Sequence, residues 1–380
     1  MPALSLCLVR RTQDFLRELH GSAVKTLSLL VWALALVKKP NLSQWARVLG
    51  LYRKRPDGSR QAYGFAYKKF RIWRFLSRSI FRPEELWEAI THRLLDPRDS
   101  LRRRHPIFIL MDWTDLGDQM ALVLALPYHG RALPLLVEIV EKCYLENSMT
   151  DLELECVRRF LGWLSPGLRS RIEFLADRGF AKIELFEAIE EAGATYAIRL
   201  PRHFQISLSQ GWVALGDLGL GVLEEREYRD IECTQEHRHR LGIRMRRIMT
   251  GAAHDPDDDT WYIATNRSEI SPVLGHYALR MKVEELFRDW KHLLDLDGHE
   301  LAGEDALGRL VGVLGVYYVL VVLEGQAHTT PERLRQITRP GRRSPELSIF
   351  RQTQAVLERW SDEAGWISPD LLMPLWTQRR

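Results

Sequence analysis

The chain has 380 residues, 46% of them hydrophobic, which is enough for a large core and for two or three folded units. Its four cysteines, at positions 7, 143, 156 and 233, have neither disulfide-framework nor zinc-finger spacing, which excludes a small scaffold stabilised by either. The longest apolar runs, 26–37 and 310–323, are shorter than the ~20 residues of a membrane span, and no secretory signal is evident, so we expect a cytoplasmic protein without a membrane partner.

The net charge of +4 is unevenly distributed along the chain. Residues 1–105 hold 22 lysines and arginines against 8 acidic residues, whereas residues 106–380 hold 32 against 42. A strongly basic segment suits a polyanion such as DNA, because it neutralises phosphates and releases their counterions. We therefore predict that residues 1–105 form a DNA-binding domain. The alternative, a basic surface that serves solubility alone, is disfavoured because the excess is so concentrated.

The N-terminal part of this segment has helical periodicity. Apolar residues recur at helical spacing within residues 1–40, and Asn41 is a suitable N-cap for a short helix at 44–49 that ends near Gly50. A short capped helix of this kind fits the first helix of a helix-turn-helix. It fits a plain three-helix packing unit equally well.

A second basic element is predicted at residues 65–81. One side of this predicted helix carries four apolar residues, which are Phe70, Trp73, Leu76 and Ile80. The other side carries three arginines, which are Arg71, Arg74 and Arg78. No acidic residue lies between Gln61 and Pro83, so we predict that the three arginines contact the DNA backbone, with an ordinary solvated face as the alternative. The arginine run at 102–104 is predicted to be a linker.

The pattern changes after Pro106 to short apolar runs separated by turns. We predict strands at 107–111, 120–126, 132–140, 172–176 and 195–200, with helices at 151–164 and 180–191. Acidic residues follow two of these strands. This order predicts an α/β fold with a ribonuclease-H-like mixed sheet.

The rest of the chain divides into three parts. Residues 201–259 read as an all-β insertion that ends in a strand at 261–265. A charged helix at 272–294 and an apolar helix at 301–325 follow, and the tail at 329–380 is predicted to be helical. We thus predict a helical DNA-binding domain at 1–105, a catalytic domain at 106–325 and a helical C-terminal region at 326–380.

Three acidic residues occupy positions suited to a two-metal site. Asp112 ends the first strand, Asp177 ends the fourth, and Glu284 lies in the charged helix. Mg²⁺ prefers carboxylate oxygens, and two such ions can hold the attacking and leaving oxygens of a phosphoryl transfer. Position alone does not single these three out of 50 acidic residues, because acids at strand ends are often caps.

The motifs around these acids carry a family resemblance. Tyr277, Arg280, Glu284 and Lys291 follow the spacing of the YREK signature, which places them at offsets 0, 3, 7 and 14 on one helical stripe. The sequences at 111–115, 128–131 and 177–180 read Met-Asp-Trp-Thr-Asp, Tyr-His-Gly-Arg and Asp-Arg-Gly-Phe. Over residues 105–325 the chain therefore resembles the hairpin-forming bacterial DDE transposases of the insertion sequence 4 family.

The resemblance implies roles for individual residues. Asp112, Asp177 and Glu284 correspond to a triad that binds two Mg²⁺ ions, with Mn²⁺ as a substitute. Tyr277, Arg280 and Lys291 correspond to residues that contact DNA near the transposon end. Trp261 corresponds to a tryptophan that holds a flipped base, although a core tryptophan is nearly as good an interpretation. Met281 stands where some members have a second tryptophan, so a stacking role there is in doubt.

Neighbouring acids leave some ambiguity within the motifs. Asp115 and Asp118 lie close to Asp112, and Glu285 follows Glu284 directly. The motif spacing favours Asp112 and Glu284. We expect Asp115 and Asp118 to start the turn into the second strand, and Glu285 to point about 100° away from the stripe of Tyr277.

The resemblance implies a cut-and-paste transposase. It implies a homodimer that pairs two terminal inverted repeats, cleaves through a hairpin intermediate and joins the ends to target DNA, with the C-terminal region as a dimerisation or end-binding element. One alternative is a structure-selective nuclease on the same core that cannot join DNA. The other is a catalytically silent repressor, derived from a transposase, that only binds DNA.

Overall fold

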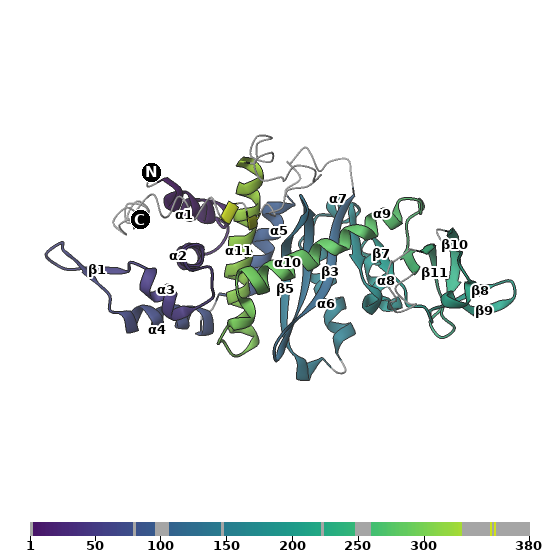
Figure 1. Ribbon diagram of the computed structural model, residues 1–380, viewed down its shortest axis with the longest axis horizontal. Helices are drawn as coiled ribbons and strands as arrows, with labels where there is room; N and C mark the ends of the chain where they lie inside the picture. Colours follow the sequence, from purple (N-terminus) through teal and green to yellow (C-terminus); the bar gives the residue numbers. More distant parts are fainter. Residues whose placement is uncertain are drawn as a thin grey trace, which may run out of the picture. The chain divides into compact units, whose positions relative to one another are not determined.

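The computed structural model describes residues 3–78, 81–95, 106–145, 148–221, 224–247 and 260–328, together with residues 350, 351, 353 and 354. The chain is a mixed α/β protein with a large mixed sheet and helices at both ends (Figure 1). It divides into two compact units, one of residues 1–93 and 288–380 and the other of residues 94–287. The predicted linker at 102–104 and nearly all of the predicted helical tail lie outside the described residues. The division into three functional domains stays a prediction.

The first unit begins with three helices, α1 (Ala3–Phe15), α2 (Gly21–Val37) and α3 (Leu42–Val48). The helices predicted before residue 40 are thereby confirmed. The Asn41 side chain accepts a hydrogen bond from the backbone N–H of Gln44 at 2.9 Å. Asn41 is thus the N-cap of α3, because it satisfies a donor that has no partner within the helix.

A small hairpin of β1 (Tyr52–Lys54) and β2 (Arg60–Ala62) leads into α4 (Phe65–Arg78) and α5 (Pro83–Leu94). The helix predicted at 65–81 is confirmed, and its predicted packing face is right in part. Leu76 is buried as predicted, but Phe70 is 54% exposed, and Ile72, which was not placed on that face, is buried. Ile80 lies outside the described residues. Aromatic residues lie on most sides of this helix, so the periodicity alone could not decide which side contacts its neighbours.

The long helix α11 (Glu304–His328) forms the centre of the first unit and packs against α1, α2 and α4. By length and composition it could cross a membrane, but 94% of its most apolar window is buried, as in the core of a globular protein. The Arg309 guanidinium donates hydrogen bonds to the carbonyls of Leu76 and Phe81 at 2.7 and 2.8 Å. Because Leu76 lies in the last turn of α4, Arg309 satisfies a carbonyl at that helix end.

We predict that Arg309→Met lowers the free energy of unfolding by about 2–4 kcal/mol, because it leaves buried carbonyls without donors. Urea denaturation followed by circular dichroism measures this change. The exposed Arg74 of α4 is the control, and Arg74→Met should change the same quantity by about 0.5 kcal/mol or less. Equal effects of the two substitutions would contradict a docking role for Arg309.

The second unit begins with the three antiparallel strands β3 (Ile107–Leu116), β4 (Gln119–Tyr128) and β5 (Arg131–Glu141). They confirm the strands predicted at 107–111, 120–126 and 132–140. His129 and Gly130, between β4 and β5, both have positive φ angles, 45° and 80°. These angles are typical of a two-residue hairpin turn, whose twist matches that of the strands.

Two parallel strands continue the sheet beside β3. The order of the ten strands is β5-β4-β3-β6-β7-β12-β11-β10-β8-β9. β6 (Ile172–Ala176) is parallel to β3 and β7 (Thr195–Arg199) is parallel to β6, and Met111 of β3 lies opposite Ala176 of β6. The residue after Met111 is Asp112, and the residue after Ala176 is Asp177. This register therefore places Asp112 beside Asp177, which follows the end of β6. The prediction that Asp112 ends its strand is wrong, because β3 continues to Leu116 paired with β4.

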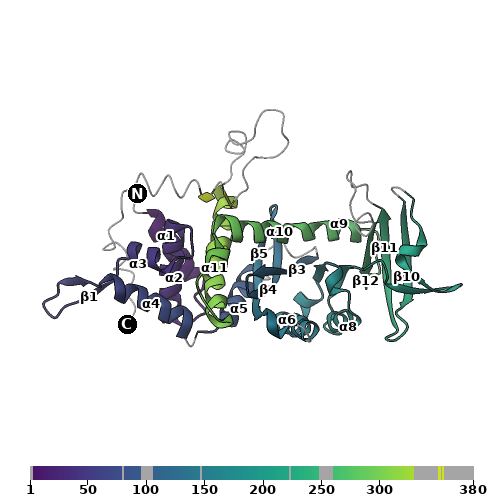
Figure 2. The same ribbon diagram turned by 60° about the horizontal axis from the view of Figure 1, so that its bottom comes forward.

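Helices cover both faces of this part of the sheet. α6 (Met149–Gly162) and α8 (Ile183–Glu191) lie on one face, and α9 (Val273–Tyr277) and α10 (Met281–Arg288) on the other (Figure 2). A short α7 (Pro166–Arg169) precedes β6. Neighbouring residues of a strand point to opposite faces, so Asp112 and Trp113 face different helices.

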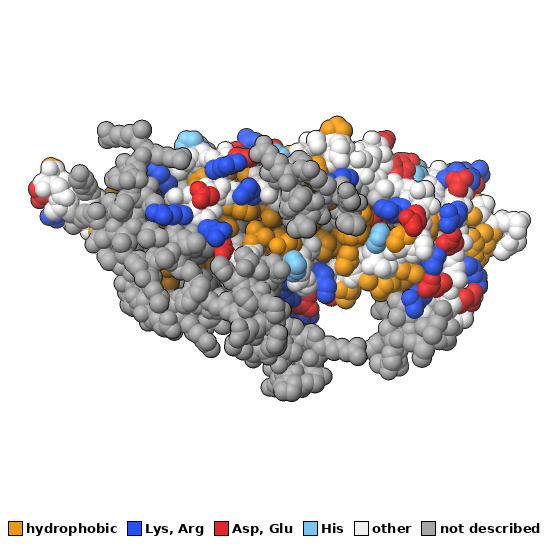
Figure 3. All heavy atoms as spheres, turned by 90° about the horizontal axis from the view of Figure 1, so that it is seen from above, with side chains coloured by type: hydrophobic (Ala, Val, Ile, Leu, Met, Phe, Trp, Pro, Cys, Tyr) orange, Lys and Arg blue, Asp and Glu red, His pale blue; other side chains and the backbone are white. Residues whose placement is uncertain are grey.

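The described part of residues 201–259 is all-β except for one short 3₁₀ turn, as predicted. It comprises β8 (Gln205–Leu208), β9 (Gly211–Ala214), β10 (Glu225–Cys233) and β11 (His239–Arg247), and β12 (Thr260–Thr265) joins them to β7. The strands thus extend the same sheet. Basic and acidic side chains are interspersed here (Figure 3), and Arg244 pairs with both Glu225 and Glu227.

The predicted single α-helix at 272–294 is wrong in its hydrogen bonding. A 3₁₀ turn (Ala278–Arg280) separates α9 from α10, and a π-turn (Asp289–Leu293) follows α10. Tyr277, Ala278 and Met281 nevertheless have right-handed helical angles. The chain therefore keeps its helical direction while its hydrogen-bond register changes twice, which an apolar periodicity does not reveal.

Candidate active site

The three predicted acids surround one guanidinium group. Arg280 Nη1 lies 2.7 Å from Asp112 Oδ2, and Arg280 Nη2 lies 3.1 Å from Glu284 Oε1 and 3.9 Å from Asp177 Oδ2. β3 positions Asp112, the end of β6 positions Asp177, and the helical segment over the sheet positions Arg280 and Glu284. Residues separated by up to 172 positions in the sequence thus meet at one point.

Asp112 is the most enclosed of the three carboxylates. Its side chain is 18% exposed, and its Oδ1 accepts a hydrogen bond from the backbone N–H of Trp113 at 2.9 Å. Burial raises the pKa of Asp112 to about 6, although the positive charge of Arg280 opposes this rise. Asp112 therefore depends on a nearby cation to stay ionised near neutral pH.

Asp177 caps the turn that follows its strand. Its carboxylate accepts the backbone N–H of Arg178 at 2.7 Å and the hydroxyl of Tyr277 at 3.4 Å. Burial, with the charge of Asp177, raises the pKa of Tyr277 to about 12, so the phenol stays protonated and can donate. The Trp261 ring meets the Tyr277 ring edge to face, with centroids 5.0 Å apart. Trp261, predicted from the family resemblance, therefore lies beside the acids.

The neighbouring acids take other partners. Glu285 pairs with Arg131, which follows the turn between β4 and β5, whereas Glu284 pairs with Arg280. Asp115 accepts the backbone N–H of Gly117 at 3.0 Å, which confirms that it starts the turn into β4. The choice of Asp112 and Glu284 over their neighbours stays a prediction, and both of these acids contact Arg280.

Arg280 supplies the positive charge among these acids. Its side chain is only 10% exposed. Burial disfavours its charge, but Tyr277 and the three carboxylates outweigh burial and raise its pKa. Three carboxylates this close would repel one another strongly without a cation between them.

The acids match a divalent metal in their chemistry. Among the described residues, no group of three His, Cys, Asp or Glu side chains already has the geometry to hold a metal ion. The Arg280 guanidinium instead occupies the point on which the carboxylates converge, as a stand-in cation. Carboxylate oxygens are the ligands that Mg²⁺ prefers, so Asp112, Asp177 and Glu284 are the residues that would hold it.

A buried ion cluster supports the helix over the acids. Glu173 of β6 is completely buried, and its two oxygens lie 2.9 Å from Arg267 Nη1 and 2.9 Å from His276 Nδ1. His276 directly precedes Tyr277, so the cluster connects β6 to the segment that carries Tyr277 and Arg280. Sequence reasoning missed it, although a glutamate inside the apolar run 172–176 was a signal that could have indicated it.

The remaining predicted DNA-binding residues belong to the other compact unit. Lys291 lies in the π-turn at 289–293 and is half-buried. Arg71 is half-buried on α4, and Arg74 and Arg78 are exposed there. The structure thus places six of the predicted site residues in the second unit, which are Asp112, Asp177, Glu284, Tyr277, Arg280 and Trp261. The four basic residues Lys291, Arg71, Arg74 and Arg78 belong to the first unit.

One carboxylate on β3, a second directly after the neighbouring parallel strand β6 and a third on a covering helix define a class of site suited to metal-dependent phosphoryl transfer. Residues 159–317 match a family model described as a transposase DDE domain. The matched stretch contains Asp177 and Glu284 and begins after Asp112. The chain therefore carries a transposase DDE domain, which implies phosphoryl transfer on DNA, and DNA binding. The comparison with curated proteins gave no match.

We predict that Asp112→Asn stabilises the metal-free protein at pH 8. An acid whose pKa is raised to about 6 in the folded state destabilises that state once it is ionised, and Asn removes this charge. The gain in unfolding free energy should be about 1–3 kcal/mol above pH 6, shrink between pH 6 and 4, and vanish below pH 4. Urea denaturation across this pH range measures it, and a loss of stability at pH 8 would contradict the assignment.

Proposed function

We propose that the protein is a cut-and-paste DNA transposase of the insertion sequence 4 type, with a ribonuclease-H-like core. One observation carries the proposal: acids from three separate predicted motifs converge on the arginine of the YREK motif. The transposase DDE domain match at 159–317 supports the same reaction class. The mixed sheet, in which the antiparallel strands β5, β4 and β3 are followed by the parallel strands β6 and β7, is compatible with this core.

The proposed chemistry is an in-line displacement at phosphorus. When bound, two Mg²⁺ ions, or Mn²⁺ in their place, would activate the attacking hydroxyl and stabilise charge on the leaving oxygen. Asp112, Asp177 and Glu284 are the residues that would hold these ions with their carboxylates. Arg280, which pairs with these carboxylates, would then have its charge available for a DNA phosphate. Tyr277 keeps its proton and orients Asp177.

The proposed DNA substrate enters through aromatic and basic residues. Trp261 lies against Tyr277 beside the acids, where it could stack on a base flipped out of a hairpin end. Lys291 is proposed to contact a phosphate near the same end. We propose a homodimer that pairs two terminal inverted repeats, acts in the cytoplasm at the nucleoid, and joins the cut ends to target DNA.

The experiment is a cleavage and strand-transfer assay on DNA that carries the element's own ends, with Mg²⁺ or with EDTA. We predict metal-dependent hairpins and joined products from the native protein, and a loss of at least about 10³-fold in Glu284→Ala. Glu285→Ala is the matched control, because the adjacent glutamate pairs with Arg131 and should cost only a few-fold in rate.

Each alternative gives a different product pattern in this assay. Nicks without joined products would favour the structure-selective nuclease. Binding without cleavage in either metal would favour the silent repressor. Equal losses in Glu284→Ala and Glu285→Ala would contradict the assignment of the third acid.

The basic surface of α4 is proposed to contact the DNA backbone. Three of its aromatic side chains are also exposed, which are Phe65, Tyr67 and Phe70. The Arg78 guanidinium lies over the Trp73 ring, 5.2 Å from its centre, a cation–π contact. A helix with exposed cations and aromatics, and no acidic residue from Ala62 to Arg82, suits a nucleic-acid partner.

We predict that replacing Arg71, Arg74 and Arg78 together by Gln weakens DNA binding and flattens its salt dependence. The slope of log K against log salt should fall by about 0.9 for each lost phosphate contact, or roughly 3 in total. Fluorescence anisotropy at several salt concentrations measures this slope. The control replaces three exposed arginines that already pair with acids, which are Arg229, Arg238 and Arg240. An unchanged slope in the α4 variant would remove these residues from the interface.

A further inference from the structure

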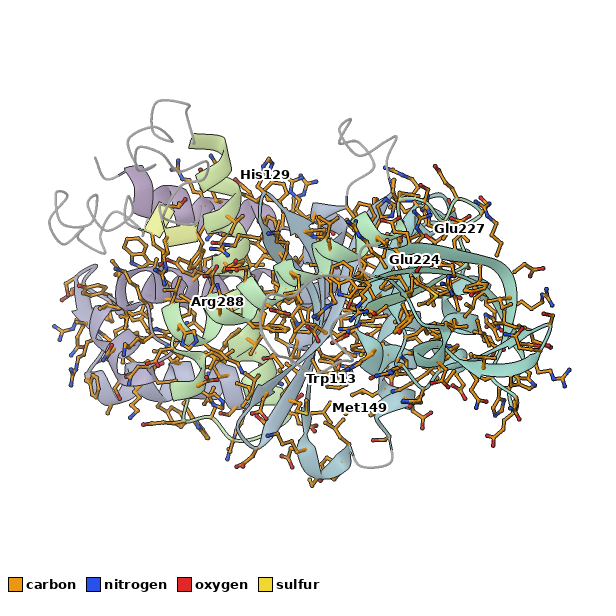
Figure 4. The ribbon with its side chains drawn as sticks, turned by 45° about the vertical axis from the view of Figure 1, so that its right-hand side comes forward. Trp113, His129, Met149, Glu224, Glu227 and Arg288 are labelled. Carbon is orange, nitrogen blue, oxygen red and sulfur yellow. The ribbon has the colours of Figure 1, made fainter. Side chains whose placement is uncertain are left out.

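Trp113 connects the first acid to the opposite face of the sheet. Its backbone N–H donates to Asp112 Oδ1 at 2.9 Å, and its indole Nε1–H donates to Glu153 Oε1 at 3.0 Å. Glu153 belongs to α6, on the face of the sheet away from Arg280. In Figure 4, Trp113 points toward the start of α6, where Met149 is labelled. One residue therefore joins Asp112 to a carboxylate that lies outside the acid site.

The second oxygen of Glu153 reaches the segment after the second acid. Glu153 Oε2 lies 2.6 Å from Lys182 Nζ, and the Glu153 side chain is 1% exposed. Lys182 lies five residues after Asp177, at the end of the turn that Asp177 caps and directly before α8. Both oxygens of Glu153 are thus used, one toward the strand of Asp112 and one toward the turn of Asp177.

We propose that Glu153 is a positioning residue that fixes the separation and orientation of Asp112 and Asp177. β6 ends at Ala176 opposite Met111, whereas β3 continues to Leu116 paired with β4, so the backbone pairing between β3 and β6 stops at Met111 and Ala176. Beyond that pair, Glu153 connects β3 to the segment after β6, because it contacts Trp113 on the first and Lys182 on the second. This inference rests on the proposed function, because it concerns the acids that would hold the metal.

Burial gives the bridge its rigidity. A carboxylate removed from water is stable only when charged or strongly polar partners satisfy it, so Glu153 holds both donors firmly. Glu153 does not act on the substrate itself, because Trp113 and Lys182 separate it from the acids. Groups that orient metal ligands in this indirect way commonly change metal affinity or activity by about 10–100-fold when they are replaced.

The experiment compares Glu153→Gln and Glu153→Leu with Glu138→Gln in the full-length chain. Gln can still accept from Trp113 but loses the charge opposite Lys182, whereas Leu loses both contacts. Glu138 of β5 is the matched control, because it is a glutamate that pairs at 2.7 Å with Arg159 of α6, the helix that carries Glu153. Three quantities are measured: Mn²⁺ affinity by calorimetry without DNA, DNA cleavage with Mg²⁺, and the melting temperature.

We expect Glu153→Gln to weaken Mn²⁺ binding and cleavage by about tenfold, and Glu153→Leu by about 100-fold, with Glu138→Gln within about threefold of the native protein. Comparable melting temperatures in Glu153→Gln and Glu138→Gln would separate positioning from general stability. If both Glu153 variants fail to fold, Lys182→Met and Trp113→Phe each remove one contact and should lower Mn²⁺ affinity several-fold.

Three outcomes would overturn the proposal. One is a folded Glu153→Gln protein with native Mn²⁺ affinity and cleavage, which would leave the proposed transposase function intact. The second is an equal loss in Glu153→Gln and Glu138→Gln, which would reduce Glu153 to a stabilising residue. The third is a native protein that neither binds Mn²⁺ nor cleaves DNA, which would overturn the proposed function as well.

Discussion

The contact between Arg280 and three carboxylates is the interaction on which the second unit depends. Asp112, Asp177 and Glu284 come from a strand, a turn and a helix, and their mutual repulsion disfavours bringing them together. A buried guanidinium offsets that repulsion, because it lies within 4 Å of all three side chains. Arg280 lies in the 3₁₀ turn Ala278–Arg280, where the segment over the sheet changes from α to 3₁₀ hydrogen bonding. The position of the covering helix therefore also decides where the positive charge of Arg280 meets the three carboxylates.

Buried carboxylates brace these acids from both faces of the sheet. Glu173 holds the covering segment through His276 and Arg267, and Glu153 connects β3 to the segment after Asp177 through Trp113 and Lys182. An apolar residue at either position would leave these donors without an acceptor, and it would not fix an angle, because dispersion contacts are not directional. Hydrogen bonds to both oxygens of a carboxylate do fix one. Glu173 and Glu153 thus fix the orientation of the segments that carry the acids.

Most of this arrangement was predictable where the determinants are local. The strands at 107–200 follow apolar runs, and Asn41, Asp115 and the triad follow turn chemistry or motif spacing. The errors have a different origin. Phe70 was placed on the packed side of α4 because a helical wheel cannot tell which aromatic side faces α3 and α11. Glu153 was missed because its partners lie 40 residues before it and 29 after it, and no local pattern records such pairings.

The arginines of the β insertion and those of α4 differ in how closely acidic residues surround them. The described β insertion contains many arginines, but several pair across β10 and β11 with acids of the same sheet, as Arg244 does with Glu225 and Glu227. Such neighbouring opposite charges cancel beyond about 10 Å at moderate salt. The α4 segment has no acidic residue to produce this cancellation, and its exposed Arg74 and Arg78 keep a field that reaches into solvent. Total arginine content would rank the two surfaces as similar, whereas the arrangement of charges makes α4 the stronger attractor for a phosphate backbone.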